Sequence, residues 1–104
     1  MALQRVAALA EVPEGGNKAF DACGKSVLLC RTAAGVFAVE NMCSHALAHL
    51  EGGKVKGPHI FCPLHGVRFD MRTGEPNGTL TRKPITVFPV SVEGDDVLVE
   101  LPDA

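Results

Sequence analysis

The chain has 104 residues, of which 46% are hydrophobic and 21% are charged, and its formal net charge at neutral pH is -2. This composition is typical of one small globular domain with its own core, and the length leaves no room for a second catalytic module. The charge balance predicts no nucleic-acid partner and no binding to anionic membranes. The N-terminus lacks a basic segment followed by an apolar run, and no stretch approaches the roughly 18 apolar residues of a membrane span. We therefore expect a cytoplasmic protein.

Glycine and proline divide the first 40 residues into short segments. Residues 3–12 are rich in alanine and leucine and have helical propensity, up to the break at Pro13-Glu14-Gly15-Gly16. Strands are then expected around residues 19–20, 26–31 and 36–40, with turns at Cys23-Gly24-Lys25 and before Gly35. These three strands predict a small antiparallel meander.

The second half of the chain also favours strands. Turn signals at residues 51–53 and 57–58 bracket residues 54–56, which are expected to form a hairpin with a strand at 59–61, and a further strand is expected at 67–70. Residues 76–84 predict an irregular loop, and residues 85–92 and 97–101 a closing hairpin around 93–96. Pro89 places its strand at a sheet edge or next to a bulge. Roughly nine short strands without a long helical period indicate an all-β fold.

Two similar groups of metal-ligating residues stand in the middle of the chain. Cys43-Ser44-His45 is followed by sixteen residues and then by Cys62-Pro63-Leu64-His65. Thiolates and imidazoles together favour iron-sulfur, zinc or copper. Structural zinc sites usually take like ligands from one turn, whereas each turn here supplies one Cys and one His. This mixture suits a binuclear cluster in which both turns send a thiolate to one iron and an imidazole to the other, the ligand set of a Rieske [2Fe-2S] centre.

The motif C-x-H-x16-C-x2-H, together with Gly66-Val67-Arg68-Phe69-Asp70 and Thr73-Gly74, resembles Rieske-type proteins. In particular, it resembles the small ferredoxins of bacterial aromatic-ring dioxygenase systems. The resemblance runs from the strand at 36–39 to the hairpin at 88–94, and so covers most of the chain.

This resemblance implies a single Rieske domain over residues 1–104 with one [2Fe-2S] cluster. Cys43, His45, Cys62 and His65 would be the ligands of the two irons. The implied fold has three small antiparallel sheets, with a cluster-binding lobe at about residues 42–70 inserted between strands of a basal lobe. It also favours a strand at 3–6 and one helical turn at 7–10 over a longer helix.

The resemblance further indicates a low redox potential. Neutral imidazoles in place of two thiolates raise Rieske potentials to roughly -150 to +300 mV, and hydrogen bonds to the sulfurs tune them. High-potential respiratory relatives place hydroxyl donors where this chain has Val67 and Phe69. They also have a disulfide at the positions of Ala48 and Leu64. Neither feature is possible here, so we expect the negative end of the range.

By resemblance, the chain is an electron carrier and not an enzyme, because it lacks the separate mononuclear iron site of a ring-hydroxylating oxygenase. It would accept single electrons from a flavin-containing reductase and pass them to a terminal oxygenase, acting as a monomer. Two alternatives remain open. One is a small Rieske subunit fixed in another oxidoreductase, such as nitrite reductase, and the other is a zinc-stabilised interaction module.

The residues beside the ligands predict how the carrier docks. They are largely apolar and predict a hydrophobic docking tip around His45 and His65, formed by Ala46, Leu47, Ala48, Leu50, Pro63 and Leu64. The competing prediction is docking through Lys54, Lys56 and Arg68, which added salt would weaken.

Four further residues of metal-ligating type lie outside the motif. His49 and His59 are expected to be solvated or packing histidines, and Cys23 and Cys30 to be buried thiols.

Overall fold

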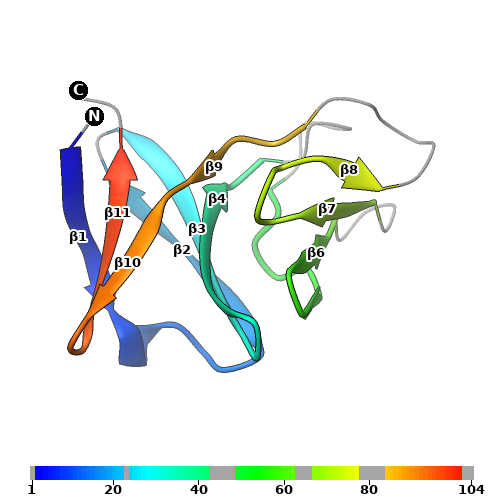
Figure 1. Ribbon diagram of the computed structural model, residues 1–104. Coiled ribbons are helices and arrows are strands. Elements are labelled where there is room, and N and C mark those ends of the chain that lie inside the picture. The colour runs from blue at the N-terminus through cyan, green and yellow to red at the C-terminus, as the bar shows by residue number, and fades with distance from the viewer. Residues whose placement is uncertain (1, 23, 43–48, 63–66, 78–83, 102–104) are drawn as a thin grey trace.

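The computed structural model describes residues 2–22, 24–42, 49–62, 67–77 and 84–101. Its strands form three antiparallel sheets, as predicted (Figure 1). The outer basal sheet has the order β1-β11-β10, the central sheet β2-β3-β4-β9, and the cluster-lobe sheet β5-β6-β7-β8. Among the described residues, no helix is long and apolar enough to cross a membrane.

The strand bounds are as follows. The outer basal sheet contains β1 (Ala2–Ala8), β10 (Val90–Glu93) and β11 (Asp96–Leu101). The central sheet contains β2 (Gly16–Ala22), β3 (Lys25–Thr32), β4 (Gly35–Glu40) and β9 (Val87–Phe88). The cluster-lobe sheet contains β5 (Val55–Lys56), β6 (His59–Phe61), β7 (Arg68–Asp70) and β8 (Pro76–Asn77).

The central sheet is the middle layer of the molecule, and its strand β3 is buried on both faces. Val27 and Leu29 belong to the core shared with the outer basal sheet, whereas Leu28 and Cys30 belong to the core shared with the cluster lobe. Successive side chains of a strand point to opposite faces, so four consecutive buried residues require packing on both sides. The unbroken apolar run Val27–Cys30 therefore fixes a three-layer arrangement, seen edge-on in Figure 1.

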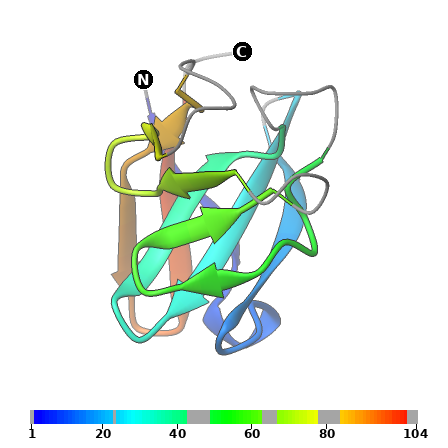
Figure 2. The same cartoon turned by 90° about the vertical axis from the view of Figure 1, so that its right-hand side faces the viewer.

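The cluster lobe is inserted between β4 and β9, as the resemblance implied, and lies over one face of the central sheet (Figure 2). The buried hydrophobic residues that the structure describes in this lobe belong to a core shared with the central sheet. Ile60 and Phe69 are fully buried in the same apolar cluster as Leu28 and Val39 of the central sheet. The position of the lobe thus depends on packing against β3 and β4.

Three predicted element boundaries were wrong. The helical turn expected at 7–10 is a 3₁₀ turn at Leu9–Glu11, because β1 continues pairing with β11 as far as Ala8. Residues 76–77, expected in a loop, pair with β7 as an edge strand. A proline is tolerated at such an edge because its missing N–H leaves no internal ladder position empty.

The third difference concerns the strand expected at 85–92, which is interrupted at Pro89. Residues 87–88 pair with β4 in the central sheet, whereas residues 90–93 pair with β11 in the outer basal sheet. Pro89 has no N–H for either ladder, but its carbonyl accepts a hydrogen bond from Glu100 N at 2.9 Å. The proline therefore lies where the chain passes from one sheet to the other.

Candidate metal centre

The two ligand segments are the connections that precede β5 and follow β6. Cys62 comes directly after β6, is a free thiol and has only 2% of its surface exposed. Cys43, His45 and His65 lie outside the described residues. Cys62 is therefore the predicted ligand whose surroundings are defined.

The described ends of both ligand segments meet in one apolar cluster. Leu50, which follows the first segment, is buried with Cys62 and Val67, which flank the second. The backbone N–H of Cys62 donates to the carbonyl of Val67 at 2.8 Å and so joins the two described ends of the second segment. Convergence of the two segments is what a shared four-ligand cluster requires, and two thiols with two imidazoles form the donor set of a Rieske centre.

Asn41 fixes the first ligand segment at both ends. It directly follows β4 and is 97% buried, and its Oδ1 accepts a hydrogen bond from the backbone N–H of Glu51 at 2.8 Å. Its Nδ2 donates to Ser26 Oγ at 3.1 Å and lies 3.4 Å from Nδ1 of His49. An asparagine has both a donor and an acceptor, so one side chain joins the two ends of the loop. Asn41 was not among the residues predicted from the sequence, although it stands only two residues before Cys43.

Strand β2, at the edge of the central sheet, forms hydrogen bonds with the turn at residues 51–53 of the cluster lobe. Asn17 of β2 accepts a hydrogen bond from Gly52 N and donates one to the carbonyl of Gly53, both at 2.8 Å. Glu51 Oε2 accepts a hydrogen bond from the backbone N–H of Ala19 at 2.7 Å. Residues 51–53 are therefore attached to β2 by side chains from both partners.

The structure also describes one cysteine and two histidines that are not among the predicted ligands. Cys30 is a buried free thiol, as predicted, and burial raises its pKa to about 12, so it remains protonated. His49 is exposed, and His59 is half-buried on β6. Both positions agree with the prediction of solvated or packing histidines. Cys23 lies outside the described residues.

One of the residues predicted to form the hydrophobic docking tip is not at the surface. Leu50 is completely buried, because it packs beneath the lobe and contributes to the shared core. It therefore cannot contact a partner. The other apolar residues of that prediction lie outside the described residues.

The low redox potential was predicted from the residues at positions 67 and 69, and both lie in the core. Val67 is 4% exposed and Phe69 is fully buried, and neither side chain carries a hydrogen-bond donor. Both follow the second ligand segment in the chain and share one buried cluster with Cys62. Their burial leaves an apolar wall on this side of the second ligand segment.

The comparisons with known proteins agree with this site. Residues 2–89 match the family model of the Rieske [2Fe-2S] domain. The chain belongs to this Rieske family. It is 35% identical to the ferredoxin component of the naphthalene 1,2-dioxygenase system of Pseudomonas aeruginosa over 94 residues, which are 90% of each chain.

Solved Rieske structures share the whole fold. The ferredoxin of carbazole 1,9a-dioxygenase from Nocardioides aromaticivorans IC177 has a TM-score of 0.86 and 39% identity, with 95% of this chain and 97% of that chain covered. A chain from the complex of reduced oxygenase and oxidized ferredoxin in carbazole 1,9a-dioxygenase has a TM-score of 0.82 and 30% identity, with 93% and 91% covered.

These findings identify the cofactor and the class of protein. The Rieske chain has a [2Fe-2S] cluster as its cofactor, and its relatives are ferredoxin components of aromatic dioxygenase systems. It is an electron-transfer protein and not an enzyme with a substrate site of its own. When bound, the cluster supplies reversible one-electron chemistry.

Proposed function

We propose that this Rieske protein is a low-potential ferredoxin that carries single electrons from a flavin-containing reductase to the terminal oxygenase of an aromatic-ring dioxygenase system. The proposal treats residues 1–104 as one domain with a cluster-binding lobe at about 42–70, acting as a cytoplasmic monomer. Cys43 and Cys62 would bind one iron, and His45 and His65 the other.

One observation supports the low potential. The walls next to Cys62 are the buried side chains of Val67 and Phe69, which cannot donate hydrogen bonds to cluster sulfurs. A hydroxyl donor at either position would stabilise the extra negative charge of the reduced cluster, so the apolar side chains there favour a stronger reductant. A strong reductant suits the delivery of electrons for oxygen activation.

The first test is an EPR spectrum of the dithionite-reduced protein with a redox titration. We expect the rhombic signal of mixed Cys/His ligation and a midpoint toward the negative end of roughly -150 to +300 mV. A midpoint near the upper end would contradict the low-potential assignment. A colourless protein with stoichiometric zinc would instead establish the zinc-stabilised interaction module.

The ligand assignment is tested with a matched pair of histidine variants. His65→Ala should lose the EPR signal and the bound iron, whereas His59→Ala should retain both because His59 lies on the solvent face of β6. Retention of a Rieske spectrum by His65→Ala would disprove its role.

Purification separates a carrier from a fixed subunit of another oxidoreductase. A carrier should elute alone as a monomer and pass electrons to an added oxygenase. Constant copurification with a large partner, such as a nitrite reductase, would contradict the proposal.

A further inference from the structure

The outer face of the cluster lobe is defined by strand alternation. Val55, Ile60 and Phe69 point toward the shared core. Their neighbours along the strands therefore point outward, in two rows across the sheet. One row contains Lys54, Phe61 and Arg68, and the other contains Lys56, His59 and Asp70. We call these six residues the basic face.

The positive charges of the basic face are not balanced within it. Asp70 is its one acidic residue, and its carboxylate accepts two hydrogen bonds from the Arg72 side chain, at 2.8 and 3.0 Å. The bonds from Arg72 lower the pKa of Asp70 to about 2. In the part of the chain that the structure describes, Lys54, Lys56 and Arg68 form no ion pair. These three cations are therefore available to a partner.

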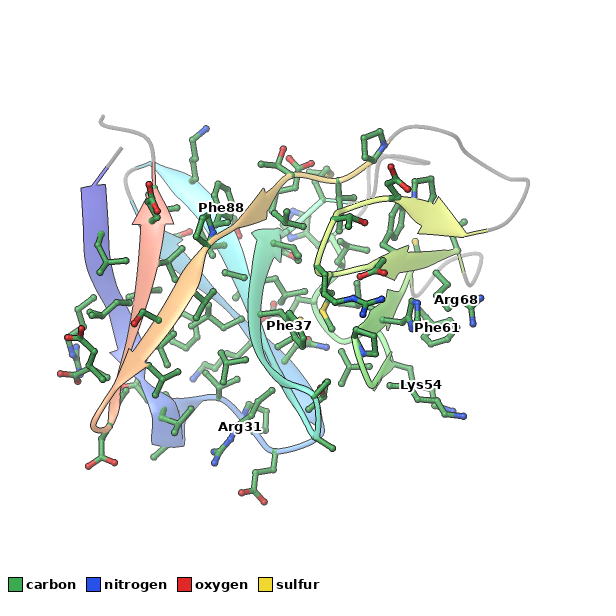
Figure 3. The ribbon with its side chains drawn as sticks, viewed as in Figure 1. Arg31, Phe37, Lys54, Phe61, Arg68 and Phe88 are labelled. Atoms are coloured by element: carbon green, nitrogen blue, oxygen red, sulfur yellow. The ribbon has the colours of Figure 1, made fainter. Side chains whose placement is uncertain are left out.

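The face also has features of an interface centre. Phe61 is half-buried and lies between Lys54 and Arg68, and Figure 3 shows the three side chains on the same outer side of the lobe. A surface hollow of about 370 Å³ lies beside Phe61, lined also by Pro58 and Arg68. Aromatic and arginine side chains are enriched at the centres of protein interfaces.

The opposite end of the molecule has the opposite charge. Residues 84–101 contain four acidic side chains and no basic one; Asp96 forms an ion pair with Arg5 of β1 at 2.7 Å, and the other three are Glu93, Asp95 and Glu100. The turn between β10 and β11 lies at the far end of the molecule from the cluster lobe (Figure 1). A negative partner surface would therefore attract the cluster lobe and repel the basal end, which orients the encounter despite the net charge of -2.

We propose that the basic face docks against a carboxylate-rich surface of the terminal oxygenase. This inference rests on the proposed function, and it adds the surface and the charge of the partner. Phe61 and Arg68 are next in sequence to Cys62 and Val67, which flank the second ligand segment, so a partner bound here lies beside the cluster. The oxygenase is the named occupant because a similar chain comes from a complex of ferredoxin and oxygenase.

The test compares three charge reversals that change the net charge equally. Lys54→Glu and Lys56→Glu alter the basic face, and Lys18→Glu alters an exposed lysine of β2 in the basal lobe. All three holoproteins are first checked for an unchanged visible spectrum and EPR signal. Binding is then measured on carboxylate-terminated and amine-terminated monolayers on gold, a probe that needs no identified partner.

We expect the wild type to bind the carboxylate monolayer at about 0.01 M salt and to be released toward 1 M, as the Debye length falls from about 30 Å to about 3 Å. Lys54→Glu and Lys56→Glu should each bind about three- to tenfold more weakly, and Lys18→Glu like the wild type. Equal weakening by all three variants would show that net charge alone matters and would overturn the proposal.

Stopped-flow electron transfer identifies the partner. Chemically reduced protein is mixed with an oxygenase that accepts its electrons, and the second-order rate should fall about three- to tenfold in the two face variants only. Unchanged rates would overturn the docking site, and so would slowing confined to reduction by the reductase. If even the wild type with an intact cluster reduces no oxygenase, the proposed function itself fails, and this assignment fails with it.

Discussion

Strands β3 and β4 of the basal lobe are eight and six residues long, whereas the four strands of the cluster lobe have only two or three residues each. Such short ladders give little stability by themselves. The cluster lobe relies instead on the core shared with β3 and β4, on side-chain hydrogen bonds such as those of Asn41 and Asn17, and on its ligands. The redox site therefore lies in the lobe that depends more on its surroundings for stability.

Loss of the cluster should have the largest effect, because it should destabilise the cluster lobe and leave the basal lobe folded. Cys62→Ala removes a proposed iron ligand, and we expect loss of iron together with loss of amide protection in residues 55–61 and 67–70. Residues 25–32 should stay protected, because the long strands of the basal lobe remain paired. Iron analysis and hydrogen exchange measure both effects.

The matched control is Cys30→Ala, which truncates a thiol that is equally buried but outside the ligand set. It should keep its iron and cost about 1 kcal/mol of stability through the small cavity. Full iron content in Cys62→Ala, or uniform loss of protection in both lobes, would contradict the comparison.

A methyl group at Gly53 should destabilise the cluster lobe nearly as severely. A Cβ there would overlap the carbonyl oxygen of Phe61 and lie 2.9 Å from the carbonyl oxygen of Leu50, and neither backbone atom can easily move. We expect Gly53→Ala to cost about 3 kcal/mol in urea unfolding.

The neighbouring Gly52 is the control for this change. It has a φ of 88° and open space around it, so Gly52→Ala introduces only backbone strain of about 1 kcal/mol. Equal costs for the two variants would show that close packing at residue 53 is unimportant.

Removal of the Asn41 side chain tests the hydrogen bonds that fix the lobe. Asn41→Ala removes a buried side chain that accepts the part-buried hydrogen bond from the N–H of Glu51 and donates to Ser26 Oγ, and we expect a cost of about 2 kcal/mol and faster loss of cluster absorbance. Asn17→Ala removes two bonds at the more accessible edge of β2 and should cost about 1 kcal/mol. A larger loss of stability in Asn17→Ala than in Asn41→Ala would show that the hydrogen bonds to β2 contribute more than those of Asn41.

The smallest effect concerns acid stability. The hydrogen bonds from Arg72 lower the pKa of Asp70 to about 2, below the usual value of about 3.9. The ionised form is therefore favoured in the folded state, and this stabilisation is complete above pH ~4 and is lost as the pH falls toward 2. Because Arg72 is 63% exposed, we expect no more than about 1 kcal/mol.

Asp70→Asn isolates this contribution in pH-dependent thermal unfolding. The variant should lack this part of the stability difference between pH ~6 and pH ~2, whereas the wild type should show it. Identical pH profiles would mean that the pair with Arg72 does not stabilise the fold.

The amino-acid sequence by itself predicted the donor set and determined most of the strands. Cys43, His45, Cys62 and His65 form a pattern that depends only on local spacing, and the family match agrees with the chemistry derived from it. The meander and the hairpins were also predictable, because glycine and proline mark turns through their own backbone preferences. The burial of Cys30 followed in the same way from the apolar run around it.

Tertiary structure alone decided which neighbours of the ligands face the core and which face outward. Leu50 resembles the exposed apolar residues of a docking tip in sequence, but it is buried because β3 and the cluster lobe close over it. Pro89 signals an edge or a bulge, yet its role as the passage between two sheets depends on β4 and β11, which come from distant parts of the chain. The basic face likewise arises only when β5, β6 and β7 align, because cross-strand register, and not sequence distance, places Lys54 and Arg68 on either side of Phe61.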